Sequence, residues 1–226
     1  MEKIVIEIRD IEGGEDAKLL VKDMKSIYLK SIKNNNFNLD KIEDRDGTVN
    51  LWISGKRCKK FFGEEIGCHK FQRVPPTEKN GRVHTSVVSV AVLEEKQEQE
   101  VEIEYKDVQI IYTKGTGPGG QHKNKVETCV VLRHIPTNIQ VKIDGRSRKR
   151  NEEEAWKELK KRLQDNLNKQ VNNAYSQERR DQIGERSRSN FRRNYNLKLG
   201  IVSDDLTGKK TTFKNIQKGK IELLHI

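Results

Sequence analysis

The sequence has few of the features that place a protein in a membrane or an oxidising compartment. No run of about 18 apolar residues occurs in its 226 residues, which argues against a membrane-spanning helix. The N-terminal stretch MEKIVIEIRD alternates apolar and charged residues and lacks the apolar block of a signal peptide. The three cysteines are odd in number and have no metal-ligand spacing. We therefore expect reduced thiols in a cytoplasmic protein, at Cys58, Cys68 and Cys129.

Apolar residues are also scarce. Hydrophobic side chains make up 33% of the chain and charged ones 35%, so we expect a modest core, in one large domain or two small ones. The 45 Lys and Arg residues exceed the 34 Asp and Glu residues, for a formal net charge of +11. This excess favours a polyanionic partner, which is RNA, DNA or an anionic membrane surface. The alternative is a merely lysine-rich protein, which the stretch NNNFN also fits.

The apolar pattern predicts an α+β fold. Alternation of apolar and polar residues predicts strands. Apolar residues at helical spacing predict one helix over residues 15–35, after a Gly13–Gly14 turn, and a longer one over residues 152–184. We expect Asn151 to cap the long helix, whose apolar face is formed by Ala155, Leu159, Leu163 and Leu167. The predicted strands cover residues 3–10, 37–44, 48–55, 83–95, 101–105, 105–115, 128–145 as a hairpin, 210–216 and 220–226.

The stretch GTGPGGQHKNK, residues 115–125, concentrates glycine in one loop. A nucleotide-hydrolase phosphate loop needs Gly-Lys-Ser/Thr after the glycines, but Gln121 stands there, so nucleotide hydrolysis is disfavoured. Gly119 and Gly120 allow the backbone N–H of Gln121 to lie bare against a ligand. The next residues supply donors for RNA phosphate, from His122, Lys123 and Lys125. The alternative is an ordinary flexible hairpin tip.

The surroundings of this loop resemble the catalytic domain of the bacterial and organellar class I peptide chain release factors. Five residues match that family's GGQ loop in order: Gly119, Gly120, Gln121, His122 and Asn124. A turn with His134, Pro136 and Thr137 follows, although Asn138 replaces the family's usual glycine. Arg146 and Ser147 match the segment before the long helix.

A second stretch, GCHKFQRVPPTEKNGRVHTSVVSVAV, resembles the family's codon-reading region. Pro75, Pro76 and Thr77 fit the Pro-x-Thr tripeptide of the type that reads UAA and UAG, whereas the type that reads UAA and UGA carries Ser-Pro-Phe. The resemblance implies further codon contacts from Gln72, His84 and Thr85, and from a helix tip that holds Gly13, Gly14 and Asp16. It also implies contacts with ribosomal RNA or tRNA from basic and polar residues, namely His122, Lys123, Asn124, Lys125, Arg146, Arg148, Arg186, Arg188 and Arg192.

The resemblance implies a translation termination factor that reads a stop codon and promotes hydrolysis of the peptidyl-tRNA ester only within the ribosome. The implied domains are a codon-recognition domain over residues 1–103, a GGQ domain over 104–185 and a C-terminal segment over 186–226 that packs back on the first. The expected partner is the ribosome, and a methyltransferase could modify Gln121 at N5. We expect a monomer without metal ion, cofactor or membrane partner, in the cytoplasm of a bacterium or a phage host, or in an organelle.

Family members begin with a long helical domain, and this chain is expected to begin close to the codon-reading domain. This difference leaves open whether a partner GTPase acts on it. A second interpretation is therefore a rescue factor, whose GGQ loop releases peptides from stalled or damaged ribosomes. A third interpretation is a non-catalytic RNA-binding protein whose GGQ loop is inactive. Relatives that rescue ribosomes lose the codon-reading loop or carry a basic tail. Here the stretch from Pro75 to Thr85 is complete and the tail GKIELLHI is not basic, which favours stop-codon reading.

Overall fold

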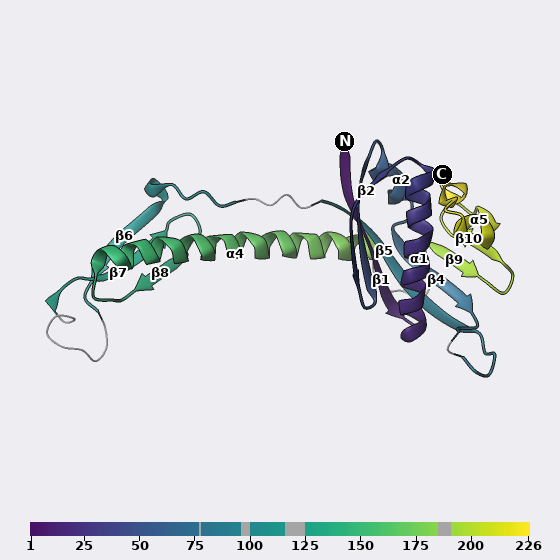
Figure 1. The fold of residues 1–226 in the computed structure, drawn as a ribbon, viewed down its shortest axis with the longest axis horizontal. Helices are drawn as coiled ribbons and strands as arrows, with labels where there is room; N and C mark the ends of the chain where they lie inside the picture. The colour runs from purple at the N-terminus through teal and green to yellow at the C-terminus, as the bar shows by residue number, and fades with distance from the viewer. Residues whose placement is uncertain (77, 96–99, 116–124, 185–190) are drawn as a thin grey trace. The chain divides into compact units, whose positions relative to one another are not determined.

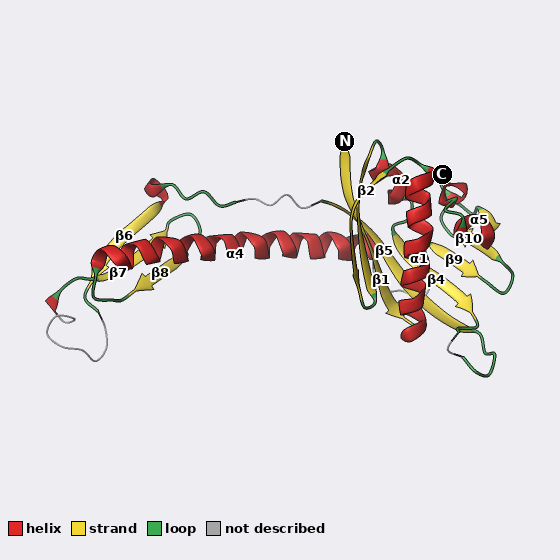
Figure 2. Ribbon diagram, viewed as in Figure 1, coloured by secondary structure: helices red, strands yellow, loops and turns green. Residues whose placement is uncertain are grey.

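The structure is a computed structural model that describes residues 1–76, 78–95, 100–115, 125–184 and 191–226 (Figure 1). The chain forms two compact units. The first combines Met1–Lys96 with Tyr175–Ile226, and the second is Gln97–Ala174. Strands and helices are interspersed in both units (Figure 2), which confirms the predicted α+β class.

The first unit is built on one sheet of eight strands among its described residues. Their order is β11-β10-β9-β4-β5-β1-β3-β2, and neighbours are antiparallel except for the parallel pair β4 and β9. Its strands are β1 (Glu2–Glu12), β2 (Asn38–Arg45), β3 (Thr48–Gly55), β4 (Gly67–Arg73), β5 (His84–Glu94), β9 (Arg193–Asn196), β10 (Ile201–Asp204) and β11 (Lys210–Thr212). Three strands from the C-terminal segment, β9, β10 and β11, therefore continue a sheet that the N-terminal segment begins.

Helix α1 (Glu15–Asn34) lies against this sheet (Figure 1). The predicted helical spacing is confirmed, because its apolar side chains are buried together with Ile4, Ile6 and Ile8 of β1. Burial of that face removes apolar area from water and so drives the packing of helix on sheet. The buried apolar residues of α1 are Ala17, Leu20, Val21, Met24, Ile27, Tyr28 and Ile32.

The C-terminal segment is tied into the first unit by a buried charged cluster. The Arg193 guanidinium lies 2.5 Å from the Glu65 carboxylate and 3.3 Å from that of Asp204, and all three side chains are fully buried. Buried charges of this kind are tolerated only when paired, because an uncompensated ion in the interior is costly. His225, the penultimate residue, reaches the same Glu65 carboxylate at 2.8 Å.

The second unit places one face of a helix on a small sheet. Strands β6 (Val108–Thr113), β7 (Cys129–His134) and β8 (Gln140–Ile143) form an antiparallel sheet in that order. Helix α4 (Arg148–Ile183) buries Ala155, Leu159 and Leu163 against it. Leu167, predicted on the same face, is only half-buried. Residues 148–174 of this helix belong to the second unit and residues 175–183 to the first.

Several local predictions were wrong. Residues 101–104 form no strand, and the backbone N–H of Val101 donates instead to the side chain of Gln164 at 3.0 Å. Only residues 210–212 of the predicted strand 210–216 are extended, since helix α5 (Phe213–Gln217) follows at once. The predicted strand 220–226 contains a 3₁₀ turn, η2 (Ile221–Leu224), which buries Ile221 and Leu224 at a spacing of three.

Strands β4, β9 and β10 were not predicted, and neither were two further short elements. Helix α2 (Cys58–Gly63) buries Cys58 and Phe62, and a 3₁₀ turn, η1 (Tyr105–Asp107), precedes β6. All three cysteines are buried and none is in a disulfide, in agreement with the predicted reduced thiols. Within the ranges that the structure describes, every helix is too short or too polar to cross a bilayer.

Candidate functional site

Strands β4 and β5 form the hairpin that carries most of the predicted codon contacts. Across the two strands Arg73 lies opposite His84, and Gln72 lies opposite Thr85. Side chains of directly opposed residues stand about 5 Å apart on one face. The structure thus brings Gln72 and Thr85 side by side, with Thr85 exposed and Gln72 half-buried.

The loop that joins the two strands is organised around Glu78. Its backbone N–H donates to the carbonyl of Pro75, three residues earlier in the chain, at 3.0 Å. Thr77 itself lies outside the described residues. The Glu78 carboxylate accepts from the backbone N–H of Asn80 at 2.7 Å and lies 2.8 Å from Nε2 of His84. The carboxylate therefore ties the loop to the first residue of β5.

The electrostatic setting of Glu78 agrees with this role. The backbone N–H of Asn80, followed by His84 and Arg82, lowers the pKa of the Glu78 carboxyl below its ordinary value. Only 7% of the Glu78 side chain is exposed, against 48% for His84. The His84 ring is thus fixed at one nitrogen and open to solvent over much of its surface. Sequence reasoning missed Glu78, although it directly follows the Pro-x-Thr tripeptide.

The tip of helix α1 lies beside the hairpin because Gly13 allows a close approach. Gly13 has a φ of 119°, and a Cβ on it would meet Oγ of Ser86 on β5 at 2.3 Å. Any larger residue would therefore push the helix tip off the strand. Gly14 also has a positive φ, of 57°, but a Cβ there would meet open space. Both glycines are exposed, as a contact with RNA requires.

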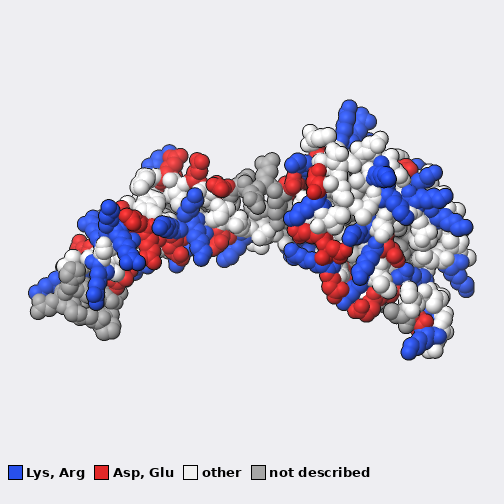
Figure 3. Space-filling model, in the orientation of Figure 1, with Lys and Arg blue, Asp and Glu red and all other residues white. Residues whose placement is uncertain are grey.

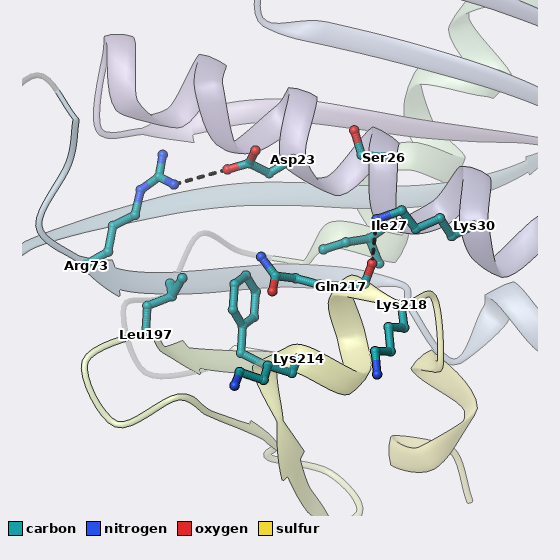
Figure 4. A pocket seen from close by; sticks show the side chains of 10 residues that line it. Asp23, Ser26, Ile27, Lys30, Arg73, Leu197, Lys214, Gln217 and Lys218 are labelled. Atoms are coloured by element: carbon teal, nitrogen blue, oxygen red, sulfur yellow. Dashed lines mark hydrogen bonds and ion pairs between the residues drawn. The ribbon is translucent and has the colours of Figure 1, made fainter.

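Asp16 is buried at this junction. Its carboxylate accepts from Arg73 Nη2 at 2.6 Å and Nε at 3.0 Å, and from the hydroxyl of Ser86 at 2.8 Å. Arg73 also reaches Asp23, about two helical turns further along α1, at 3.1 Å (Figure 4). Asp16 is 4% exposed, so its side chain is committed to joining helix and hairpin. Arg73 and Ser86 were missed because nothing in a linear sequence pairs them with Asp16.

The loop-bearing end of the second unit is described only at its flanks. Gly119, Gly120, Gln121, His122, Lys123 and Asn124 lie outside the described residues. Thr113 at the end of β6 is paired with Cys129 at the start of β7, so the intervening segment leaves and returns at adjacent strand ends.

Asn151 supports the returning limb. Its side-chain amide donates to the carbonyls of Thr128 at 2.8 Å and Gly145 at 3.0 Å, and it is 4% exposed. The prediction that Asn151 caps α4 was wrong, since the helix begins at Arg148 and Asn151 is inside it. It serves instead as a buried bridge between two loops and the helix.

The turn after β7 accommodates asparagine at a position where the family pattern has glycine. Asn138, where the family usually has glycine, adopts a positive φ of 56°, which asparagine tolerates better than most residues. Its side chain accepts from Arg133 Nε at 2.7 Å. Nδ1 of His134 lies 2.8 Å from the hydroxyl of Thr137, which fixes the other side of the turn.

The basic residues singled out in the sequence have different environments. Lys125, Arg146 and Arg148 are exposed, and the Arg148 guanidinium lies 3.4 Å from the centre of the Tyr112 ring. Arg192 is only 10% exposed, and it pairs with Glu64 at 2.9 Å and Asp204 at 3.2 Å. Its charge is therefore engaged within the fold. Arg186 and Arg188 lie outside the described residues.

Comparison with known proteins places this fold and these motifs in a family. A model of the PCRF domain matches residues 1–90, and a model of the RF-1 domain matches residues 95–205. The two models together account for most of the chain, which belongs to the class I peptide chain release factor family.

Particular relatives agree with this assignment. The chain is 36% identical over 213 residues to peptide chain release factor 1 of Limosilactobacillus reuteri, covering 91% of this chain and 59% of that protein. It is 37% identical over 210 residues to peptide chain release factor 1 of Thermotoga maritima, covering 90% and 61% respectively. The solved structure of RF2 of Thermus thermophilus matches with a TM-score of 0.55 at 25% identity, over 99% of this chain and 66% of that one. The chain thus spans about three fifths of the length of these curated relatives.

Proposed function

We propose that this protein acts on the ribosome as a translation termination factor that reads UAA and UAG and promotes hydrolysis of the peptidyl-tRNA ester. The observation that carries the proposal is the junction of the α1 tip with the β4–β5 hairpin. It gathers on one unit an exposed ring, His84, an opposed pair of hydrogen-bonding side chains, Gln72 and Thr85, and a glycine turn, Gly13–Gly14.

These groups suit the reading of single-stranded RNA, which depends on base-edge hydrogen bonds and on stacking. In the proposal, Thr77 contacts the first two bases and the His84 ring stacks on a base. Gln72 and Thr85 can each donate and accept, which suits tolerance of A or G at the third position. Pro75 and Pro76 restrict the backbone that presents Thr77. Asp16 acts as a positioning residue, since its carboxylate is occupied by Arg73 and Ser86.

The hydrolytic step belongs to the loop of the second unit. Gly119 and Gly120 permit a backbone conformation closed to other residues, and the N–H of Gln121 then stabilises the oxyanion or the leaving 3′ oxygen. The Gln121 side chain fills the pocket and admits water but excludes larger nucleophiles. It is no general base, because an amide takes no proton near neutral pH. N5-methylation of Gln121 by a glutamine methyltransferase is part of the proposal, and so are RNA contacts from Lys125, Arg146 and Arg148.

Exchange of the tripeptide tests the codon assignment. Replacing Pro75, Pro76 and Thr77 by Ser, Pro and Phe should lower peptide release on UAG more than on UAA, measured as kcat/KM with purified ribosomes. Lys79→Ala, at an exposed position of the same loop, is the matched control and should leave all codons unchanged. If UAG and UAA responded equally to the exchange, the tripeptide would not read the codon. Release without any stop codon would instead indicate ribosome rescue.

A further inference from the structure

The first unit has a groove that the codon contacts above do not use. It has a volume of about 520 Å³ and lies between α1, the end of β4 and the C-terminal segment (Figure 4). Its walls come from Ile27 and Lys30 of α1, from Leu197 after β9, and from Phe213, Lys214 and Lys218 at α5. Segments almost 190 residues apart in the sequence thus build one concave surface.

The groove carries an excess of positive charge. Lys214 and Lys218 are exposed, one helical turn apart, and neither has a carboxylate partner within the described ranges. The ammonium of Lys30 is bonded to a neutral group, the carbonyl of Gln217, at 2.8 Å, so its charge is not cancelled. Asp23 is the carboxylate among the lining residues, and it is paired with Arg73 at 3.1 Å.

The surface around the groove has the same sign. Lys and Arg side chains gather over the part of the first unit that the C-terminal segment forms (Figure 3). The exposed lysines of that segment are Lys198, Lys209, Lys210, Lys214, Lys218 and Lys220, and its exposed acidic residues are Asp205 and Glu222. Such a surface attracts polyanions and makes their binding depend on salt.

The groove also has an apolar wall. Phe213 is only partly buried, and it lies with Leu197 and the buried Ile27 along one side. An aromatic face next to free ammonium groups is the combination with which proteins bind single-stranded nucleic acid, since a base stacks on the ring while cations hold the backbone. A surface for a rigid duplex needs no such ring.

The walls are held at a fixed spacing. Gly219 has a φ of 81°, and a Cβ on it would lie 2.5 Å from the backbone nitrogen of Ser31 on α1. Asn34 of α1 donates to the carbonyl of Lys218 at 2.9 Å. The backbone that presents Lys214 and Lys218 is therefore seated directly on α1, and the groove is a built feature of the fold.

We propose that this groove binds a nucleotide of single-stranded RNA, with its phosphate on Lys214 and Lys218 and its base against Phe213. The site goes beyond the proposed codon reading, because none of these three residues belongs to the hairpin or the helix tip. Arg73 joins the two regions, since it lines the groove and also holds Asp16. An RNA strand in the groove would thus lie next to the loop end of the codon-reading hairpin, where Arg73 is paired with His84.

The test measures binding of a fluorescein-labelled, mixed-sequence RNA of six nucleotides to the full chain by anisotropy, over a range of salt concentrations. The double variant Lys214→Ala, Lys218→Ala should weaken binding about tenfold and reduce the slope of log K against log salt by about 1.4, or 0.7 for each lost contact. Phe213→Leu should weaken binding about fivefold or more through lost stacking. The matched control is Lys22→Ala with Lys60→Ala, which removes the same charge from exposed positions outside the groove. Thermal unfolding of every variant verifies the fold.

The inference is overturned if the control weakens binding as much as the groove variant, or if Phe213→Leu folds normally and binds as wild type. A photo-crosslinking residue at position 218, in a complex with ribosomes, identifies the source of the RNA. Cross-links to message or to ribosomal RNA both support the site, whereas cross-links to ribosomal protein alone contradict it. Peptide release is measured separately. If the protein releases peptide but does not bind RNA in the groove, only this inference is contradicted. If it binds RNA there but does not release peptide, only the proposed function is contradicted.

Discussion

Arg73, the last residue of β4, holds Asp16 in the first turn of α1 through two hydrogen bonds, of 2.6 and 3.0 Å. The side chain of Arg73 is 14% exposed and that of Asp16 is 5% exposed. A fork of this kind fixes direction as well as distance, because the planar guanidinium presents its donors in a set geometry. This ion pair therefore helps to set the spacing between the helix tip and the hairpin, together with the Ser86–Asp16 hydrogen bond and the close approach at Gly13.

Loss of Arg73 should damage both stability and codon reading. Arg73→Met leaves the Asp16 carboxylate buried with only Ser86 as a partner, and breaking a buried pair in this way costs about 3 kcal/mol. We expect the free energy of unfolding in urea to fall by about this amount and kcat/KM for peptide release to fall with it. Arg45→Ala, at a residue whose side chain is 77% exposed, is the control and should stay within about 0.5 kcal/mol of wild type.

The loss of stability in Arg73→Met should come from the unpaired Asp16 carboxylate. Arg73→Met combined with Asp16→Asn should recover part of the stability that Arg73→Met loses, since no unpaired carboxylate then remains buried. Strict additivity of the two substitutions would show that the pair does not set this junction.

Glu78 should make the hairpin loop sensitive to acid. The backbone N–H of Asn80 and the neighbouring His84 lower the pKa of Glu78, so the folded loop prefers the ionised form. The stabilisation of the loop by Glu78 is therefore complete above the ordinary carboxyl pKa of 4.5. It is lost as the pH falls through the lower pKa that Glu78 has in the folded protein. Amide exchange of Asn80, measured by NMR against pH, should follow this course. Glu78→Ala should abolish the protection at every pH and lower kcat/KM for release about tenfold. Unchanged Asn80 protection in Glu78→Ala would refute the role of the carboxylate.

His69 should make the stability of the first unit fall between pH 6.5 and 4. Burial, together with Arg193 and Arg192 and against the pull of Glu65, lowers the pKa of His69 to about 4. The unfolded chain binds a proton near pH 6.5, but the folded one does not until about pH 4. Stability from this residue is thus complete above pH 6.5 and declines by up to about 3 kcal/mol as the pH falls to 4. Urea unfolding across this range measures the decline. His69→Gln should flatten it, and a slope that survives the substitution would assign it to another group.

Asn151 should be needed for the ordered flanks of the GGQ loop. Asn151→Asp replaces the donor to Thr128 and Gly145 by an acceptor, which leaves two carbonyls unpaired and should cost about 2–4 kcal/mol in unfolding free energy. Asn168→Ala, at an exposed position of the same helix, provides the comparison and should change stability little. Equal unfolding free energies of Asn151→Asp and Asn168→Ala would show that the hydrogen bonds of Asn151 do not stabilise the fold.

The loop glycines should matter more than the glutamine amide. In the proposal, backbone geometry places the N–H of Gln121, so Gly120→Ala should slow single-turnover peptide release more than Gln121→Ala does. The measurement is the release rate at saturating factor. The opposite order would transfer the main role to the Gln121 side chain.

The elements that could be predicted from the sequence were those with a periodic pattern of apolar residues. Alternation gave β1 and β5, and helical spacing gave α1 and the buried face of α4, because those patterns record burial directly. Contacts between distant residues left no such trace. Glu78 reads as one more charged loop residue, and Arg73 as one more basic residue, until the fold closes them on His84 and Asp16. Asn151 resembled a cap because asparagine often is one, yet the helix starts three residues earlier. Short tail segments were read as strands because two or three apolar residues fit a 3₁₀ turn equally well.

The most direct test of the central proposal is the rate of peptide release by the unmodified chain on purified ribosomes with UAA, UAG, UGA or a sense codon in the A site. The proposal predicts release on UAA and UAG at comparable kcat/KM, and values lower by two orders of magnitude or more on UGA and the sense codon. Equal release on all four messages, or release only from an empty A site, would contradict it.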